Sequence, residues 1–421
     1  MQISAHLDLD IVAVEVDETV AVMLDLAAPV VEAAHERAAA TLQVVLDRSG
    51  SMDGVRLHGA VDALCGLVAR LDARDNFGVV VFDHMAEVVV PAGPLTDKPG
   101  TIAALRAVAA RGATDLAAGY LRGLQELKRA AGGLGGTVLL ISDGHANQGL
   151  TDPEQLAGLA RSAAGERIVT ATLGYGLGYD ETLLVGLARG GSGNHHFAAD
   201  PDAASTLIAG EAAELLAKSV QAASCILHLE PSVTMLRLFN DLPVTEIGPG
   251  RLMVELGDLY SGEQRRLVLE LGVPGMAARG LATVATMSLS YVDVPALSQH
   301  MVSVPVQVNV VPGDEAARRV ADPVVRTEVL FQEAQQAKRE ASEALERGDR
   351  ASAILAFQHA DDLLADALGS APSEVVAELD RERRDIMEMR ERSAWDDATL
   401  MSKVSRASYH SSNRKRGRRQ P

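Results

Sequence analysis

The sequence predicts a doubly wound, mostly parallel α/β sheet that is inserted into a β-sandwich and followed by a helical region. Three observations predict this fold class. Over about residues 41–218, short apolar strands alternate with longer helical segments, which is typical of parallel strands joined by crossover helices. On both sides of that segment, apolar and polar residues alternate as they do in half-buried strands. After residue 313, Ala, Glu, Arg and Leu dominate and favour helices.

Two strand-rich segments flank the α/β segment. Residues 1–40 contain Val12, Val14 and Val16 at every second position, the period of a strand with one buried face. Residues 219–312 return to this period, with Gly and Pro residues between the expected strands. We therefore expect residues 1–40 and 219–312 to form one β-sandwich, with residues 41–218 inserted in it.

The α/β domain is expected to carry ligands at one edge of its sheet. Its predicted strands cover residues 42–46, 76–82, 137–142, 168–173 and 194–197, and its predicted helices cover about 55–72, 100–110, 115–131, 153–164, 180–190 and 201–218. In doubly wound sheets the ligand sits beyond the carboxyl ends of the strands. Asp47 and Asp143 both follow predicted strands, so we expect them at that edge.

The C-terminal third is expected to form helices and then a tail. Residues 313–398 predict about three helices, with breaks near Gly348 and Pro372. The stretch 351–368 is amphipathic and needs a partner face, within the bundle or on another molecule, so self-association through this region is one possibility. Arg347-Gly348-Asp349 is interpreted as a turn rather than as an adhesion tripeptide. Residues 399–421 are predicted to be a basic, disordered tail.

Composition limits the classes of function. The net charge is −18, yet Lys403 to the end holds seven basic residues and no acidic one, so the body is more acidic still. Such a body repels nucleic acid and anionic membranes, and only the tail could attract nucleic acid. Two distant cysteines, no secretory signal and no apolar run of transmembrane length predict a cytoplasmic protein without a membrane contact.

Five oxygen-bearing residues on three loops predict a metal site. Asp47-Arg48-Ser49-Gly50-Ser51 follows a predicted strand and presents one carboxylate and two hydroxyls at alternate positions. Thr114 precedes a predicted helix, and Asp143 ends a predicted strand before Gly144. Mg²⁺ and Mn²⁺ prefer such hard oxygen ligands.

These residues closely resemble the metal-ion-dependent adhesion site of the von Willebrand factor type A (VWA) family, which has a Rossmann-like fold. The resemblance covers about residues 41–210, and residues 142–152 and 174–180 are similar to the bacterial and inter-alpha-trypsin-inhibitor-like branch. It implies Mg²⁺, or Mn²⁺ or Ca²⁺, bound directly by Ser49, Ser51 and Thr114 and partly through water by Asp47 and Asp143. It also implies an open position for an Asp or Glu of a protein partner.

Two further residues are candidates for supporting roles around the metal. Asp115 either contacts the residues that bind the metal, without binding it directly, or caps the following helix, and capping is favoured. His145 lies directly after the loop that carries Asp143 and is a candidate for the rim of the site.

The sequence favours binding over catalysis. Gly132-Gly133-Leu134-Gly135-Gly136 lacks the Lys-Ser or Lys-Thr of a phosphate-binding loop, and no serine has a supporting base in its sequence context. The leading hypothesis is a non-enzymatic scaffold protein whose metal site captures an acidic residue of a partner. One alternative is a non-catalytic subunit of an ATPase-driven, chelatase-like complex. Another is association with nucleic acid through the tail.

Overall fold

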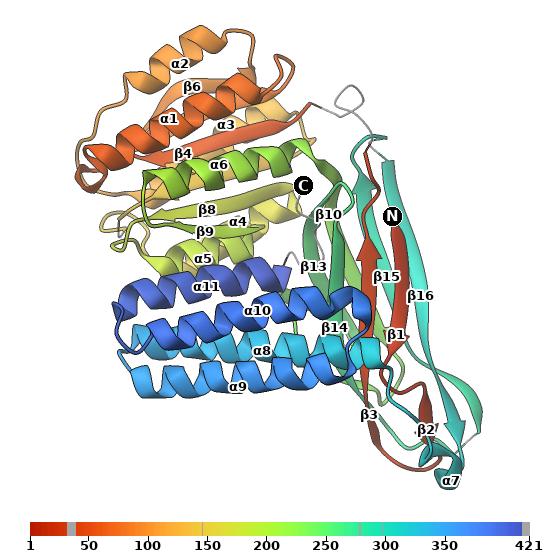
Figure 1. Ribbon diagram of the computed structural model, residues 1–421. Coiled ribbons are helices and arrows are strands. Elements are labelled where there is room, and N and C mark those ends of the chain that lie inside the picture. The colour runs from red at the N-terminus through yellow and green to blue at the C-terminus, as the bar shows by residue number, and fades with distance from the viewer. Residues whose placement is uncertain (32–38, 145, 278, 297, 415–421) are drawn as a thin grey trace.

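Three parts pack against one another in the structure: an α/β domain, a β-sandwich and a bundle of helices (Figure 1). The structure is a computed structural model, and it describes residues 1–31, 39–144, 146–277, 279–296 and 298–414. In Figure 1 the α/β domain lies above the bundle, and the sandwich runs along one side of both. Within these described ranges, no helix has the length and apolarity needed to cross a membrane.

One six-stranded sheet, with strand order β6-β5-β4-β7-β8-β9, forms the centre of the α/β domain. All neighbouring strands pair in parallel except β6, which is antiparallel to β5. The strands are β4 (Thr41–Asp47), β5 (Asn76–Phe82), β6 (Ala86–Pro94), β7 (Gly136–Ser142), β8 (Ile168–Tyr175) and β9 (Ser192–Ala198). The predicted doubly wound sheet is confirmed. The edge strand β6 was not predicted, because Pro91 interrupts its apolar run and proline is tolerated only at sheet edges.

Helices cover both faces of this sheet. One core contains residues of α1 (Val55–Arg70), α2 (Lys98–Arg106) and α6 (Pro201–Leu216). The core on the other face contains residues of α3 (Leu116–Ala131), α4 (Pro153–Gly165) and α5 (Glu181–Gly190). Strands β4, β7 and β8 are buried at every residue, which explains their continuous apolar runs.

The β-sandwich is built from both flanking segments, as predicted. One sheet has the order β1-β3-β14-β11, and the other has the order β12-β13-β10-β15-β16-β2. The first consists of β1 (Gln2–Leu7), β3 (Glu18–Ala27), β14 (Gln264–Val273) and β11 (Thr234–Leu238). The second consists of β12 (Val244–Gly248), β13 (Arg251–Tyr260), β10 (Lys218–Leu229), β15 (Gly280–Asp293), β16 (Ser298–Val311) and β2 (Ile11–Ala13). Their inner faces share one core, to which Leu24 and Leu269 contribute from the first sheet and Cys225 and Met287 from the second.

The helical region begins with the short α7 (Gly313–Ala316) and continues as a bundle of α8 (Pro323–Glu346), α9 (Arg350–Ser370) and α10 (Ser373–Arg392). Phe357 and Leu364 of the amphipathic stretch are fully buried in the bundle core together with Phe331 of α8. The partner face that this stretch needs therefore lies within the chain. Gly348 has φ = 75° and Asp349 caps α9, which agrees with the interpretation as a turn.

The prediction of a disordered tail from residue 399 is wrong for the described part of that segment. The chain forms α11 (Ala398–Arg414), which packs mainly on α8. Met401, Ser402, Ser405 and Tyr409 are all at most 2% exposed, and positions 401, 405 and 409 have the spacing of one helix face. The basic, serine-rich composition concealed this period, because Ser402, Lys403 and Ser405 are among the buried side chains. Residues 415–421, the rest of the predicted basic tail, lie outside the described residues.

Replacing Met401 by alanine tests this correction. Its side chain is fully buried in the bundle core, so Met401→Ala is expected to lower the free energy of unfolding by about 2–4 kcal/mol. Urea denaturation followed by circular dichroism measures the change. Met301→Ala, at a position that is 68% exposed on β16, is the matched control and should change stability by less than about 0.5 kcal/mol. Equal small effects at both positions would show that α11 is not packed.

Candidate metal centre

Three loops meet at the carboxyl edge of the parallel sheet. Asp47 is the last residue of β4, Asp143 directly follows β7, and these strands are hydrogen-bonded neighbours. Thr114 comes from the loop before α3. Neighbouring parallel strands end at the same edge, so the topology alone brings the two aspartates together.

Hydrogen bonds tie these side chains into one cluster. The Ser51 hydroxyl donates to Asp143 Oδ1 at 2.7 Å and lies 3.0 Å from the Ser49 hydroxyl. Asp47 accepts the Ser49 backbone N–H at 2.7 Å and the Ser142 hydroxyl at 2.6 Å. The two carboxylates and the neighbouring serine hydroxyls thus form one hydrogen-bonded cluster of oxygen atoms.

Gly144 shows how closely ligand oxygens from the three loops approach one point. A β-carbon added there would lie 3.4 Å from Ser51 Oγ, 3.6 Å from Thr114 Oγ1 and 3.8 Å from Asp47 Oδ2. Three oxygens, one from each of two loops and one from the end of β4, therefore lie around one position beside Gly144. All five residues predicted as ligands are brought together, whereas His145 lies outside the described residues.

The donor set fits a hard divalent cation. Asp47 and Asp143 are 0% and 2% exposed, and burial raises the pKa of Asp47, which the negative charge of Asp143 raises further while hydrogen bonds from Ser142 and Ser49 oppose the rise. A cation bound among these oxygens would compensate the buried charge. The candidate consists of two carboxylates and three hydroxyls. In the described part of the chain, no group of three or more His, Cys, Asp or Glu residues could hold a metal ion.

Arg56 is a residue of the site that the sequence analysis missed. It lies in the first turn of α1, and its Nη1 donates to Asp143 Oδ2 at 2.5 Å and to the Ser51 carbonyl at 3.2 Å. A cationic side chain near the start of a helix opposes the helix dipole. That local conflict is the signal in the sequence that could have indicated a nearby acid.

Arg56 and a metal ion would compete for the same carboxylate. Arg56→Gln is therefore expected to increase Mg²⁺ affinity, by about five-fold because the side chain is 39% exposed and its ion pair is partly screened. Isothermal titration calorimetry with MgCl₂ measures the change. Arg70→Gln, an exposed arginine at the other end of α1, makes the same change of charge and should leave the affinity unaltered. A decrease in affinity for Arg56→Gln would contradict this competition.

An ion-pair network, buried at Arg48 and Asp83 and exposed at Arg111 and Glu87, fixes the first two loops to each other. Arg48 is 6% exposed and donates to Asp83 at 2.8 Å and to Glu87 at 2.7 Å, and Arg111 donates to the same two carboxylates, each at 3.0 Å. Burial alone would raise the pKa of Asp83, but hydrogen bonds from Arg111, the Met85 backbone N–H and Arg48 hold this pKa below its ordinary value. Asp83 thus stays charged and orients the loops. Its role was not predicted, because it depends on which loops are neighbours in space.

Backbone and side-chain contacts fix the remaining loops. Asn147 accepts the Thr114 N–H at 3.1 Å, and its own N–H donates to the Thr114 carbonyl at 3.1 Å. Asp115 caps α3 by accepting the Ala118 N–H at 2.9 Å, which agrees with the favoured capping interpretation. Asn147 therefore holds both the N–H and the carbonyl of Thr114, whose hydroxyl lies near Gly144, the residue after Asp143.

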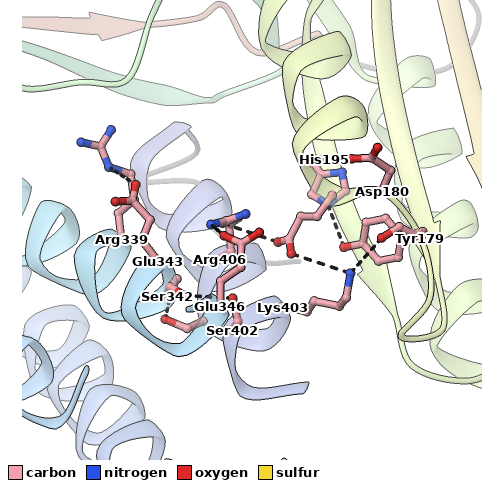
Figure 2. Close-up of polar contacts among 12 residues, drawn as sticks. Tyr179, Asp180, His195, Arg339, Ser342, Glu343, Glu346, Ser402, Lys403 and Arg406 are labelled. Atoms are coloured by element: carbon pink, nitrogen blue, oxygen red, sulfur yellow. Dashed lines mark hydrogen bonds and ion pairs between the residues drawn. The ribbon is translucent and has the colours of Figure 1, made fainter. Parts of the chain in front are cut away.

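The loop after β8 connects the site to the C-terminal helix. The Asp180 N–H donates to the Gly144 carbonyl at 3.5 Å, directly beside the metal candidate. Both sequence neighbours of Asp180 contact α11. The Lys403 ammonium group lies 3.5 Å from the centre of the Tyr179 ring (Figure 2), and the Arg406 guanidinium lies 3.6 Å from the Glu181 carboxylate. Lys403 is 4% exposed, and burial lowers its pKa although Glu181 opposes the shift. Lys403 and Arg406, two basic residues of the predicted tail, thus belong to an internal interface.

Comparison with known proteins agrees with this geometry. A sequence model of the von Willebrand factor type A domain matches residues 42–209. These residues form a VWA domain. Domains of this family usually mediate protein–protein interaction or adhesion and commonly bind a divalent metal.

Solved structures share the fold well beyond the VWA domain. A von Willebrand factor type A protein from Catenulispora acidiphila superimposes with a TM-score of 0.71 at 18% identity, covering 93% of this chain and 96% of that one. The ArnB paralog VWA2 from Sulfolobus acidocaldarius gives a TM-score of 0.61 at 15% identity, with 98% and 99% covered. The sandwich and the helical region are therefore included in the likeness.

Sequence relatives are bacterial and animal proteins. An uncharacterized protein of Synechocystis is 27% identical over 241 residues, covering 55% of this chain and 56% of the relative. The protein YfbK of Escherichia coli is 26% identical over 253 residues, covering 58% and 44%. The inter-alpha-trypsin inhibitor heavy chain H1 of Mesocricetus auratus is 30% identical over 165 residues, covering 36% and 18%. The chain thus spans about half the length of the two bacterial relatives, and the predicted resemblance to both groups is confirmed.

Proposed function

We propose that the VWA domain binds Mg²⁺ through Asp47, Ser49, Ser51, Thr114 and Asp143 and captures an acidic side chain of a protein partner there. The observation that carries this proposal is that oxygens of Ser51, Thr114 and Asp47, from separate segments, all lie beside Gly144, next to Asp143. Bound Mg²⁺ supplies positive charge and a coordination position for a carboxylate, and Mn²⁺ or Ca²⁺ would serve the same donors.

This chain's own residues prepare the site for such a partner. The hydroxyls of Ser49, Ser51 and Thr114 are neutral ligands, so the two aspartates supply the only formal negative charges of the donor set and together at most balance a divalent ion. A carboxylate from outside would then take the open coordination position without meeting an excess of negative ligands. Arg48 and Arg111, held by Asp83 and Glu87, keep the loops in place without contributing a further negative ligand to the ion.

The proposed protein is a scaffold rather than an enzyme. This part of the proposal is supported by the VWA family, which is generally non-catalytic. A cytoplasmic location is part of the proposal and agrees with the free, buried thiols of Cys65 and Cys225. Lys403 and Arg406 are engaged internally, so association with nucleic acid would depend on residues 415–421.

Partner capture with and without metal tests the proposal. The immobilised full chain is incubated with cell lysate in MgCl₂ or in EDTA, and retained proteins are identified by mass spectrometry. A partner should be retained in Mg²⁺, lost in EDTA, displaced by an aspartate-containing peptide, and lost in Thr114→Ala. Thr151→Ala, at an exposed threonine, is the matched control and should retain it. A partner that is retained equally in EDTA and by Thr114→Ala would overturn the proposal.

A further inference from the structure

A cavity of about 200 Å³ lies between the VWA domain and the β-sandwich. Val169 near the start of β8 and Ser192 at the start of β9 line it from the VWA domain, and Met253 and Glu255 of β13 line it from the sandwich. These are the amino ends of the parallel strands, whereas the metal candidate lies at their carboxyl ends. The cavity is therefore a separate site.

Unfavourable backbone conformations concentrate around this cavity. Arg167, Ser192 and Ala222 all line it and have φ values of 66°, 52° and 52°. Among the described residues only two other non-glycine residues, Glu15 and Ser232, have positive φ. This left-handed conformation is unfavourable for a residue with a β-carbon. Such strain clusters at ligand sites, where the surrounding structure maintains it.

Strand irregularities accompany the strain. The register of β10 against β13 shifts on both sides of Ala223, next to Ala222. The register of β8 against β9 shifts between Thr170 and Thr172, close to Ser192. Bulges of this kind re-aim side chains and are frequent beside functional sites. Both domains thus depart from regular strands at the place where they enclose the cavity.

Glu255 is the acidic group at this cavity that is not used by the fold. Among the described residues it forms no ion pair, and its Oε2 accepts only a long hydrogen bond of 3.4 Å from the Ser192 hydroxyl. Burial raises the pKa of Glu255, and the Ser192 hydrogen bond and Arg161 oppose this only in part. Asp258, the other acid of the lining, is instead paired with Lys218 at 2.5 Å and accepts the Ala222 N–H at 3.0 Å.

We propose that the cavity binds a small organic amine, with the ammonium group at Glu255 and Ser192 and the apolar body against Val169, Ala223 and Met253. A cationic donor would complete the hydrogen bonding of the half-buried carboxylate, and the apolar walls suit a hydrocarbon body. The volume is sufficient, since an apolar cavity of roughly 150 Å³ holds a benzene-sized molecule. This inference does not depend on the proposed function of the metal site.

Benzylamine is a suitable probe, with benzyl alcohol as its neutral counterpart. Chemical-shift titration of the full chain should give saturable benzylamine binding with a millimolar dissociation constant and shifts at residues that line the cavity. Glu255→Gln should weaken benzylamine by about ten-fold or more and leave the much weaker benzyl alcohol unchanged. Glu246→Gln, at an exposed glutamate of the neighbouring strand β12, is the matched control and should bind as the unaltered protein does.

A second variant tests the location without touching the carboxylate. Ala164 of α4 lines the cavity and is half-buried, so Ala164→Phe should fill the space and abolish binding of both probes while the circular dichroism spectrum is retained. The proposal would be overturned if benzylamine bound Glu255→Gln as tightly as the unaltered protein. Absence of saturable binding, or shifts confined to other surfaces, would overturn it as well.

Discussion

Asp143→Ala is expected to abolish measurable Mg²⁺ binding, with a loss of affinity of at least about 100-fold. Mutation of groups that merely support a metal ligand commonly costs 10–100-fold in affinity, and Asp143 is one of only two carboxylates in the proposed donor set. Its Oδ1 also accepts the Ser51 hydroxyl, so the variant loses the contact that aligns that ligand. Isothermal titration calorimetry with MgCl₂ and MnCl₂ measures the loss.

The control for this variant is another aspartate-to-alanine change in the same domain. Asp152 caps α4 by accepting the Gln155 N–H at 2.8 Å; it ends the loop that begins with Asp143 and is not one of the proposed ligands. Asp152→Ala should cost about 1 kcal/mol of stability and leave Mg²⁺ affinity unchanged. If Asp143→Ala bound Mg²⁺ as well as Asp152→Ala does, the metal would be bound elsewhere.

Glu382→Ala is expected to destabilise the helical bundle by about 3–5 kcal/mol. Lys338 of α8 is completely buried, and its ammonium group lies 2.6 Å from Glu382 Oε1. Removing the acid leaves an uncompensated buried charge, which costs far more than an exposed ion pair contributes. Hydrogen–deuterium exchange of the α8 peptides in increasing urea measures the loss. Glu343→Ala, which removes an exposed partner of Arg339, should cost less than about 1 kcal/mol.

A double variant separates the missing partner from lost packing. Lys338→Met combined with Glu382→Leu removes both charges and should recover most of the lost stability. If the double variant were no more stable than Glu382→Ala, the buried charge would not be the cause.

The stability that this ion pair contributes also depends on pH. Burial alone would raise the pKa of Glu382, but Lys338, Gln335 and Ser412 hold this pKa below its ordinary value. The contribution is therefore present at neutral pH and is lost as the pH falls through that lowered pKa.

The fold could be predicted from the sequence wherever burial imposed a clear period. Strand β5 begins and ends at the predicted residues, because its apolar run lies inside two helical layers. The edge strand β6 lacked that signal, since most of its residues are only partly buried and Pro91 interrupts it. Helix α11 was missed because its buried face includes Ser402 and Ser405, whose burial follows from contacts with α8 rather than from hydrophobicity.

The proximity of the proposed ligands could be predicted from the sequence, whereas the residues around them could not. Asp47 and Asp143 follow parallel strands, so strand order alone brought them together. The contact of Arg56 with Asp143 and the network around Asp83 join segments that are distant in the sequence, and no local pattern identifies the partner residues. The same limit applies to Lys403, whose position over Tyr179 depends on how the last helix docks.

The most direct test of the proposed metal centre is a crystal structure of the full chain with MnCl₂, using the anomalous scattering of Mn²⁺ to locate the ion. The account predicts one Mn²⁺ bound by oxygens of Ser49, Ser51 and Thr114, with Asp47 and Asp143 beside it and the Arg56 guanidinium displaced from Asp143. An anomalous map with no Mn²⁺ at these residues at saturating concentration, and with Arg56 still bound to Asp143, would contradict it.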